Sequence, residues 1–485
     1  MKTLCSRRHF LYTGGFALGG LGLLDLLLAE AEAADKGPAK PQLDPITFDL
    51  SPKAPHFAPK AKAMISLYMV GGPSHIDLFD FKPELVKLDG KPFPGKVKVD
   101  NPAQASTRVQ APLWKYKRYG RCGLEMSELL PHLGGIADDI TLIRSTHTGV
   151  NNHIPSMYAL NAGNQMAGRP TLGSWLLYGL GCETKELPAY VALTHPNGGP
   201  LVNSDNWTNG WLPSIYQGTA VRPKEPRILN LDPPDHLKGE PQSAQLDLLR
   251  KFNDDHQNTH PGESDLAARI ANYELAAKMQ LAAKEAFDVS KESKETLELY
   301  GVNDKETKDY GTRCLIARRL VERGVRFVQI FAAGQTWDHH DGIFPKLPKM
   351  CREVDKPAAA LVADLKRRGL LDTTLVHWGG EMGRLPTIQV PPGGGGDSKE
   401  KFGRDHNTYG FSMWAAGGGL EGGCAHGKTD EFGHHAVEDV VTHSDWLATV
   451  LHQFGLDPAK LSFKRNARDL TLTDGEGKVV EKILA

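Results

Sequence analysis

Short runs of apolar residues, separated by longer segments with helical periodicity, constrain the fold of this 485-residue chain more than any other feature. A run of about four to eight apolar residues bounded by glycine, proline or polar residues has the length of a buried strand. Strands that alternate with helices are typical of a mostly parallel sheet with helices on both faces. We therefore predict a doubly wound α/β fold, with strands at 63–70, 140–144, 190–193, 326–331, 374–378 and 411–416. Helices are predicted at 268–287, 312–323, 353–368 and 445–454, the last with Ser444 or Asp445 as its N-cap.

The order of the predicted elements favours one large domain. Length alone is compatible with about three domains of ~150 residues, but the strands and helices follow one another as a single α/β domain over residues 63–485. Within it, residues 197–262 have little periodicity and many Pro, Asn and Asp residues, which predicts an inserted loop or cap. Residues 34–62 are rich in Pro and Lys and are predicted to form an N-terminal arm.

Residues 1–33 have the pattern of a twin-arginine export signal. Arg7 and Arg8 are followed by a glycine-rich apolar run at 12–29, and an Ala-Glu-Ala cleavage site ends at Ala33. A transmembrane anchor is the weaker alternative, because Asp25 and several glycines interrupt the run. We predict cleavage after Ala33, export to the periplasm or the cell surface, and no transmembrane span in the mature chain.

The charge balance and the cysteine spacing exclude two classes of protein. The chain has 57 Lys plus Arg against 58 Asp plus Glu, a formal charge of −1, so no large basic surface is available and nucleic acid is not a predicted partner. Six cysteines occur, none with C-x-x-C spacing, and Cys5 lies in the signal. Neither a disulfide framework nor a four-cysteine zinc site is indicated, although the other five cysteines leave room for one or two bridges.

Side chains that can bind a divalent metal lie near the ends of most predicted strands. In a parallel sheet such residues meet at one edge, where ligands bind. A hydrolytic metal needs neutral imidazoles and ionised carboxylates around one ion, with a position left open for water or substrate. Zinc, manganese and calcium are all compatible with mixed oxygen and nitrogen ligands. The candidates are Ser74, His75 and Asp77 after the first strand, His147 and His153 after the second, Asp338 and His340 after the fourth, Glu381 and Arg384 after the fifth, and Arg404, Asp405 and His406 before the sixth.

Four motifs carry a family resemblance. They are GGPSHIDLFDFKP at 71–83, HWGGEMGR at 377–384, GRDHN at 403–407 and TDEFG at 429–433. In this order they resemble the DUF1501 family of unknown function, a branch similar to the alkaline phosphatase and sulfatase superfamily. The resemblance implies an alkaline phosphatase/sulfatase-like doubly wound sheet with long loop insertions, one or two divalent metals, and hydrolysis of phosphate or sulfate esters of small molecules or glycans.

The resemblance also implies roles for individual residues. Glu381 stands in place of the aspartate of an Asp-His pair, and His406 supplies the imidazole that this pair lacks here. The implied metal ligands are Asp77, Asp338, His340, Glu381 and His406. Residues expected behind these ligands or against the substrate are Ser74, His75, His147, Arg384, Arg404 and Asp405.

Residues 152–163 resemble the sulfatase motif C-x-P-S-R-x-x-L-x-x-G, with two departures. His153 stands where the motif has the cysteine that becomes formylglycine, and Met157 stands where it has arginine. An imidazole at this position can bind the metal, act as a general base or be phosphorylated transiently. We assign His153 a catalytic role as ligand or base.

Each candidate also has a structural interpretation. His153 can cap a helix, Glu381 can pair with an arginine, and Asp77 can close a turn. The alternative to an exported hydrolase is therefore a catalytically silent domain of the same fold that binds glycans or protein partners at the cell surface, and a phosphomutase-like transfer is a second enzymatic alternative. Convergence of the candidate ligands within about 5 Å of one point favours hydrolysis, whereas separations above about 10 Å favour the silent domain.

Overall fold

The computed structural model describes residues 48–100, 102–228, 231, 234–260, 264–393 and 398–485. The predicted signal at 1–33 and residues 34–47 of the predicted arm lie outside the described residues. From residue 48 to 62 the chain has irregular structure and is held by backbone hydrogen bonds, for example from Lys53 N to Leu180 O (3.0 Å) and from His56 N to Gly455 O (2.9 Å). Among the helices of the described ranges, none combines the length and the hydropathy needed to cross a bilayer.

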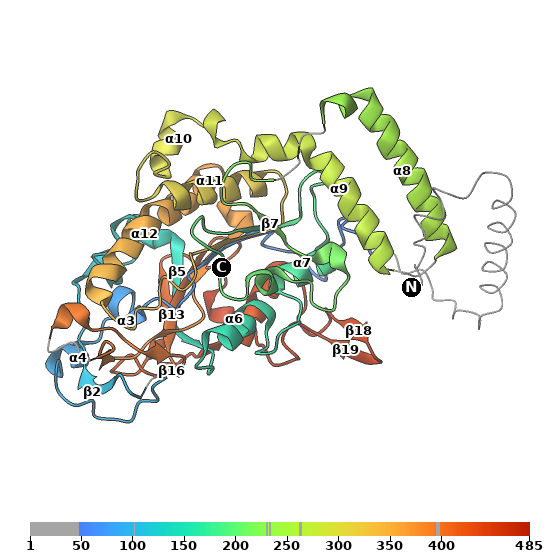
Figure 1. Cartoon of the computed structure of the whole chain (residues 1–485). Coiled ribbons are helices and arrows are strands. Elements are labelled where there is room, and N and C mark those ends of the chain that lie inside the picture. Colours follow the sequence, from blue (N-terminus) through green and yellow to red (C-terminus); the bar gives the residue numbers. More distant parts are fainter. Residues whose placement is uncertain (1–47, 101, 229–230, 232–233, 261–263, 394–397) are drawn as a thin grey trace, which may run out of the picture.

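A nine-stranded sheet forms the centre of the domain (Figure 1). Its order is β14-β5-β13-β9-β1-β8-β6-β7, and β17 also pairs with β5. All neighbours are parallel except β13, which runs antiparallel to both β5 and β9. The six predicted strands are all present, which confirms an α/β fold with a mostly parallel sheet. The strands are β1 (Ala63–Tyr68), β5 (Ile140–His147), β6 (Tyr190–Leu193), β7 (Thr219–Val221), β8 (Phe327–Phe331), β9 (Thr374–Gly379), β13 (Phe411–Ala416), β14 (Cys424–His426) and β17 (Val441–Thr442).

Helices cover both faces of this sheet, and each face has its own apolar core. Successive side chains of a strand point to opposite faces, and β1 shows the consequence. Ile65 and Leu67 belong to the core formed with α11 and α12, whereas Met64 and Tyr68 belong to the core formed with α6, α7 and α13. The bounds of these helices are α6 (His153–Ala162), α7 (Leu172–Leu180), α11 (Lys308–Glu322), α12 (Ile343–Arg367) and α13 (His443–Gln453).

Four predicted helices begin earlier in the structure: α9 (Ser264–Phe287) and α11 (Lys308–Glu322) each by four residues, and α12 and α13 as follows. Helix α12 begins at Ile343 rather than at residue 353, and it continues across Pro348 and Pro357. Proline usually marks a helix end, but here the buried apolar face extends over the whole segment and outweighs the lost hydrogen bonds. The N-cap of α13 is Thr442 and not Ser444 or Asp445: its hydroxyl accepts from Asp445 N (3.1 Å), and the Asp445 carboxylate accepts from Thr442 N (2.9 Å) in a capping box.

Residues 197–262, expected as a loop or cap insertion, contain regular structure. They include β7, an edge strand of the main sheet, and α8 (Glu240–Thr259). Helix α8 packs against α9 (Ser264–Phe287), and the two helices extend away from the sheet (Figure 1). The sequence of α8 lacks clear periodicity because most of its described side chains are exposed, so no strong apolar stripe is required.

Smaller elements surround the sheet. Two-stranded pairs join β2 (Ala105–Val109) to β11 (Thr387–Gln389), β3 (Tyr116–Tyr119) to β4 (Leu124–Ser127), β10 (Gly383–Arg384) to β12 (His406–Asn407), β15 (Lys428–Thr429) to β16 (Ala436–Glu438), and β18 (Phe463–Arg465) to β19 (Arg468–Leu470). Short helices are α3 (His75–Leu78), α4 (Pro83–Lys87), α5 (Pro131–Gly134) and α10 (Lys294–Leu299).

The direction of β13 decides which residues meet at the edge of the sheet. The parallel strands β1, β5, β8 and β9 end at the same edge, so the segments that follow them meet there. Because β13 is antiparallel to its neighbours, the residues that precede it, rather than those that follow it, lie at this edge. His406 precedes β13 and is thereby brought to the segments that follow β5 and β8.

Candidate metal centre

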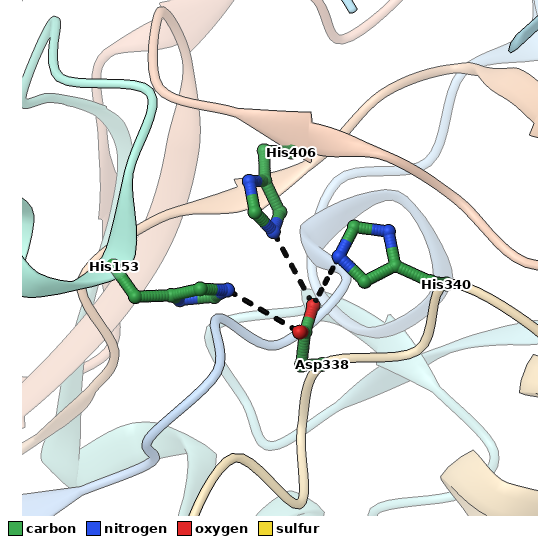
Figure 2. Close-up of side chains that lie close together, drawn as sticks. All are labelled: His153, Asp338, His340 and His406. Atoms are coloured by element: carbon green, nitrogen blue, oxygen red, sulfur yellow. Dashed lines mark hydrogen bonds and ion pairs between the residues drawn. The ribbon is translucent and has the colours of Figure 1, made fainter. Parts of the chain in front are cut away.

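Four candidate residues from three separate segments converge at this edge. His153 is the first residue of α6, Asp338 and His340 lie on the loop after β8, and His406 lies on β12 (Figure 2). One ligand atom from each of the four lies within 4.8 Å of the others. Glu381, which was also predicted as a ligand, is not one of the four and contacts the group through His153.

The Asp338 carboxylate is the centre of the cluster. Its Oδ1 lies 2.9 Å from His340 Nε2 and 3.3 Å from His406 Nε2, and Oδ2 lies 3.3 Å from His153 Nε2. The buried Arg384 guanidinium approaches Oδ1 to 2.6 Å. Burial by itself would raise the pKa of Asp338, but Arg384 and the three imidazoles outweigh it and hold that pKa well below its usual value. Asp338 is therefore an anion at any physiological pH.

Glu381 lies behind His153 and orients it. Its Oε1 accepts hydrogen bonds from His153 Nδ1 (2.7 Å) and from Gly71 N (2.8 Å). Burial opposes a charge on His153, yet Asp338 and Glu381 on its two sides raise its pKa to about 9. His153 Nε2 lies 3.3 Å from Asp338 Oδ2, close enough for an ion pair, but it does not form a hydrogen bond with it. Without a cation at the site, His153 is thus an imidazolium held between two carboxylates.

Gln389 contacts the imidazole of His340 from behind, whereas Asp405 holds the backbone of His406. Gln389 Oε1 lies 2.7 Å from His340 Nδ1 and accepts its proton, so Nε2, 2.9 Å from Asp338 Oδ1, faces the carboxylate through either a second proton or a cation. Asp405 Oδ1 accepts from His406 N (2.8 Å). Burial is the main cause that lowers the pKa of His406, and Asp338 compensates only in part. His406 is therefore neutral and is able to ligate a cation.

The donor set fits a divalent cation. Three imidazole Nε2 atoms surround one carboxylate, an arrangement that needs either a proton on each ring or one cation among them. Glu381 Oε2 and His406 Nδ1 are buried and have no hydrogen-bond partner among the described residues. The access side is that of His340, whose side chain is 30% exposed, against 10% for His153 and 3% for His406.

The glycines after β1 allow the loop to approach the cluster. Gly71 has φ of +109°, and a Cβ there would lie 2.6 Å from Asp338 N. Its amide donates to Glu381, and its carbonyl and that of Gly72 accept from Arg384. The Gly71-Gly72 backbone therefore positions two of the charged groups beside Asp338.

We expect Gly71→Ala to destabilise the fold by at least about 2 kcal/mol, because a side chain there is strained by φ and overlaps the Asp338 backbone. Urea denaturation measures this cost. The matched control is Gly369→Ala, which has a similar positive φ (+69°) but open space around its Cβ and is expected to cost about 1 kcal/mol. Equal costs for the two variants would show that the close approach to Asp338 is unimportant.

Asp77, expected among the metal ligands, lies elsewhere. Its carboxylate forms a fully buried ion pair with Arg404, with Oδ2 2.8 Å from Nε and Oδ1 3.2 Å from Nη2. It also accepts from Ser74 Oγ (2.6 Å) and Leu113 N (3.0 Å). Because these partners already occupy both oxygens, the geometry corrects the expectation: Asp77 ties loops together behind the site.

We expect Asp77→Asn to destabilise the protein by about 3–5 kcal/mol, because Arg404 would remain as an uncompensated buried charge. Denaturation midpoints measure this loss, and metal content measured on the folded fraction is expected to stay unchanged. A loss of metal without a loss of stability would show that Asp77 is a metal ligand.

The remaining candidates divide into two groups. Arg384 and Asp405 lie against the cluster, as described above. His75 contacts Gly433 O (2.8 Å) and His147 contacts Tyr409 O (3.3 Å), and neither belongs to the group around Asp338. Gln389 was missed by sequence analysis, since a glutamine at the end of a short strand carries no signal that would single it out.

A further group of potential ligands, Asp430, His434 and His435, lies between β15 and β16. The Asp430 carboxylate accepts hydrogen bonds from the backbone N of Phe432, His434 and His435. These bonds show that the carboxylate of Asp430 stabilises the loop between β15 and β16.

Comparisons with known proteins identify the family. Residues 61–484 match the family model described as "Protein of unknown function (DUF1501)", and the search of curated proteins found no match. Similar solved structures include the lipoteichoic acid synthase LtaP from Listeria monocytogenes, with 9% identity, TM-score 0.33 and coverage of 87% of this chain and 78% of that one. The PsFucS1 sulfatase from Pseudoalteromonas sp. has 13% identity, TM-score 0.35 and coverage of 87% and 72%. The phosphonate monoester hydrolase SpPMH from Silicibacter pomeroyi has 10% identity, TM-score 0.31 and coverage of 73% and 71%.

Proposed function

We propose that this chain, which belongs to the DUF1501 family, is an exported metal-dependent hydrolase of phosphate or sulfate esters. The observation that carries the proposal is the convergence of His153, His340 and His406 on the Asp338 carboxylate. Metal centres routinely bring several imidazoles and a carboxylate together around one ion at the edge of a sheet.

The ligands we assign are Asp338, His340, His406 and His153, with Glu381 behind His153. Nitrogen-rich donor sets of this kind suit zinc or manganese better than calcium, which prefers oxygen ligands. A bound cation would polarise an ester oxygen and lower the pKa of an attacking water. The formal charge of the chain is −1, so attraction for an anionic ester has to come from this local site.

In this proposal, Glu381 and His153 together determine where the protons on the His153 imidazole lie. Glu381 Oε1, 2.7 Å from His153 Nδ1, holds the Nδ1 proton. The Nε2 atom is then free to ligate or to accept a proton from water. Sulfatase-like sequences have a nucleophile at the position of His153, so a direct attack by water replaces the covalent step here.

Arg384 balances the charge of the site. It pairs with Asp338 at 2.6 Å and donates from Nε to Gly72 O at 2.8 Å, so its position is fixed from two sides. The guanidinium keeps Asp338 ionised whether or not a cation is present. It also limits the negative charge that an incoming phosphate or sulfate ester meets.

Assays with aryl phosphate and aryl sulfate test the proposed activity. We expect turnover by the metal-loaded protein and a loss of about 100-fold or more in His153→Ala. The control is His435→Ala, a half-exposed histidine outside the cluster, which is expected to keep full activity. Absence of both bound metal and turnover would contradict the hydrolase, and full activity of His153→Ala would contradict the role of His153.

The alternative is a catalytically silent domain that binds glycans or protein partners at the cell surface. The observation in its favour is that Asp338 already has four positively polarised neighbours, so the cluster can be neutral without a cation. Metal analysis separates the two, because a silent, self-neutralised cluster retains no stoichiometric metal through purification.

A further inference from the structure

We propose that Cys122 and Cys424 are a redox-active pair that forms a disulfide in an oxidising compartment. Cys122 lies in the turn between β3 and β4, and Cys424 is the first residue of β14. Cys122 is exposed and Cys424 is half-buried, whereas Cys182, Cys314 and Cys351 are buried. The two accessible cysteines of the described chain therefore lie in segments that are far apart in the sequence, and the fold brings these segments together.

Both segments pack on the same short helix, η1 (Ala137–Asp139). On one side, Cys122 N donates to Asp138 Oδ1 (2.8 Å) and Arg121 N to Oδ2 (3.1 Å). On the other side, Gly423 N donates to Ile140 O (2.9 Å), directly after the helix. The β3–β4 turn and the start of β14 are thus fixed to one another through η1.

The backbone next to Cys424 lies within bridging range of Cys122. A Cβ built on Gly423, the residue before Cys424, would lie 3.2 Å from Cys122 Cβ. Bridged cysteines have Cβ atoms about 3.5–4.5 Å apart, so the position before Cys424 approaches Cys122 even more closely than a bridge requires. Gly423 has φ of +73°, a conformation that turns the chain where the two segments meet.

Neither thiol makes a strong hydrogen bond. Cys122 Sγ lies 3.7 Å from Tyr119 O and Cys424 Sγ lies 3.4 Å from Glu421 O, and a thiol is a weak donor. A rotation about each Cα–Cβ bond therefore costs little. Burial is the main cause that raises the pKa of Cys424, and the nearby Glu421 and Cys122 raise it further.

The oxidant in this step is a small-molecule disulfide. The thiolate of one cysteine attacks the oxidant, forms a mixed disulfide and releases one thiol. The thiolate of the second cysteine then attacks the mixed disulfide, forms the Cys122–Cys424 bond and releases the second thiol. The two cysteines lose two protons and two electrons, and the oxidant is reduced to two thiols.

The bond would join the β3–β4 hairpin to an edge strand of the main sheet. The hairpin is otherwise linked to the sheet by contacts such as that of Arg144 Nη2 with Glu125 O (3.0 Å). Closing so long a loop restricts the unfolded chain and stabilises the native state.

Peptide mapping of the full chain after incubation with oxidised glutathione tests the pair. We expect a peptide that joins residues 122 and 424, a rise of at least about 2 °C in Tm, and reversal of both by a reductant. Cys122→Ser and Cys424→Ser are expected to gain neither the cross-link nor the rise, and their Tm under reducing conditions is expected to equal that of the wild type. Recovery of both cysteines as free or glutathionylated thiols in the oxidised, folded wild type would overturn the proposal.

The pair is independent of the metal centre, and one variant shows this. Asp338→Asn is expected to form the same cross-link in its folded fraction. Failure of the ester hydrolysis proposal therefore leaves the disulfide intact, and absence of the disulfide leaves metal binding untouched.

Discussion

Replacing Asp338 by Asn is expected to abolish metal binding and to lower ester hydrolysis below detection. The substitution removes the charged centre on which three imidazoles converge. It also leaves the Arg384 guanidinium, whose side chain is 0% exposed, without its counter-charge. We therefore expect a loss of stability of about 3–5 kcal/mol in addition. Elemental analysis and urea denaturation of the purified variant measure the two effects.

Asp341→Asn is the matched control for this substitution. Asp341 lies on the same loop, but its carboxylate is exposed and pairs with Lys346 at the surface. An exposed ion pair contributes at most about 1 kcal/mol, so metal content and activity are expected to be unchanged. If Asp338→Asn bound metal as the wild type does, Asp338 would not be a ligand and the proposed centre would be wrong.

Metal affinity is expected to rise by about tenfold per pH unit between pH 6.5 and 9. In the metal-free protein, Asp338 and Glu381 raise the pKa of His153 to about 9. A cation that is bound by Nε2 has to displace this proton, so each unit of pH below 9 weakens binding. Calorimetry in buffers of different ionisation enthalpy measures the proton released per metal bound.

The stability of the metal-free protein is expected to have the opposite pH dependence. The folded-state pKa of His153 lies above its unfolded value of about 6.5, so the stabilisation by the imidazolium is fully present below pH 6.5 and is lost as the pH rises through 9. The loss amounts to up to about 3 kcal/mol. His153→Gln is expected to remove both pH dependences. A metal affinity independent of pH in the wild type would exclude His153 as a ligand.

The regular structure of the main sheet was predictable because burial leaves a local pattern. Each strand of the sheet that is covered on both faces has to be apolar at almost every position, as β1 shows, and such a run is visible in the sequence. Helix α8 and strand β7 were not predicted, because an exposed helix and a three-residue edge strand need no such pattern.

The sequence identified the candidate residues of the site, but not which of them belong to the cluster around Asp338. Asp338 and His340 follow β8 closely, and a polar pair directly after a buried strand is unusual enough to be noticed. Asp77 follows β1 in the same way, yet its partner is Arg404, more than 300 residues away. The sequence around Asp77 and Arg404 gives no sign that the two form an ion pair, because the pairing depends on how two loops pack.

The sequence by itself determined the family, the alternation of strands and helices, and the set of polar residues near the strand ends, because these depend on residues that are neighbours along the chain. The tertiary structure decided which of them meet. It placed β13 antiparallel and so brought His406 to Asp338, buried Asp77 against Arg404, and put Glu381 behind His153. Charged groups take their partners from whatever the packed backbone places within a few ångströms, and that distance is set only when the whole sheet has formed.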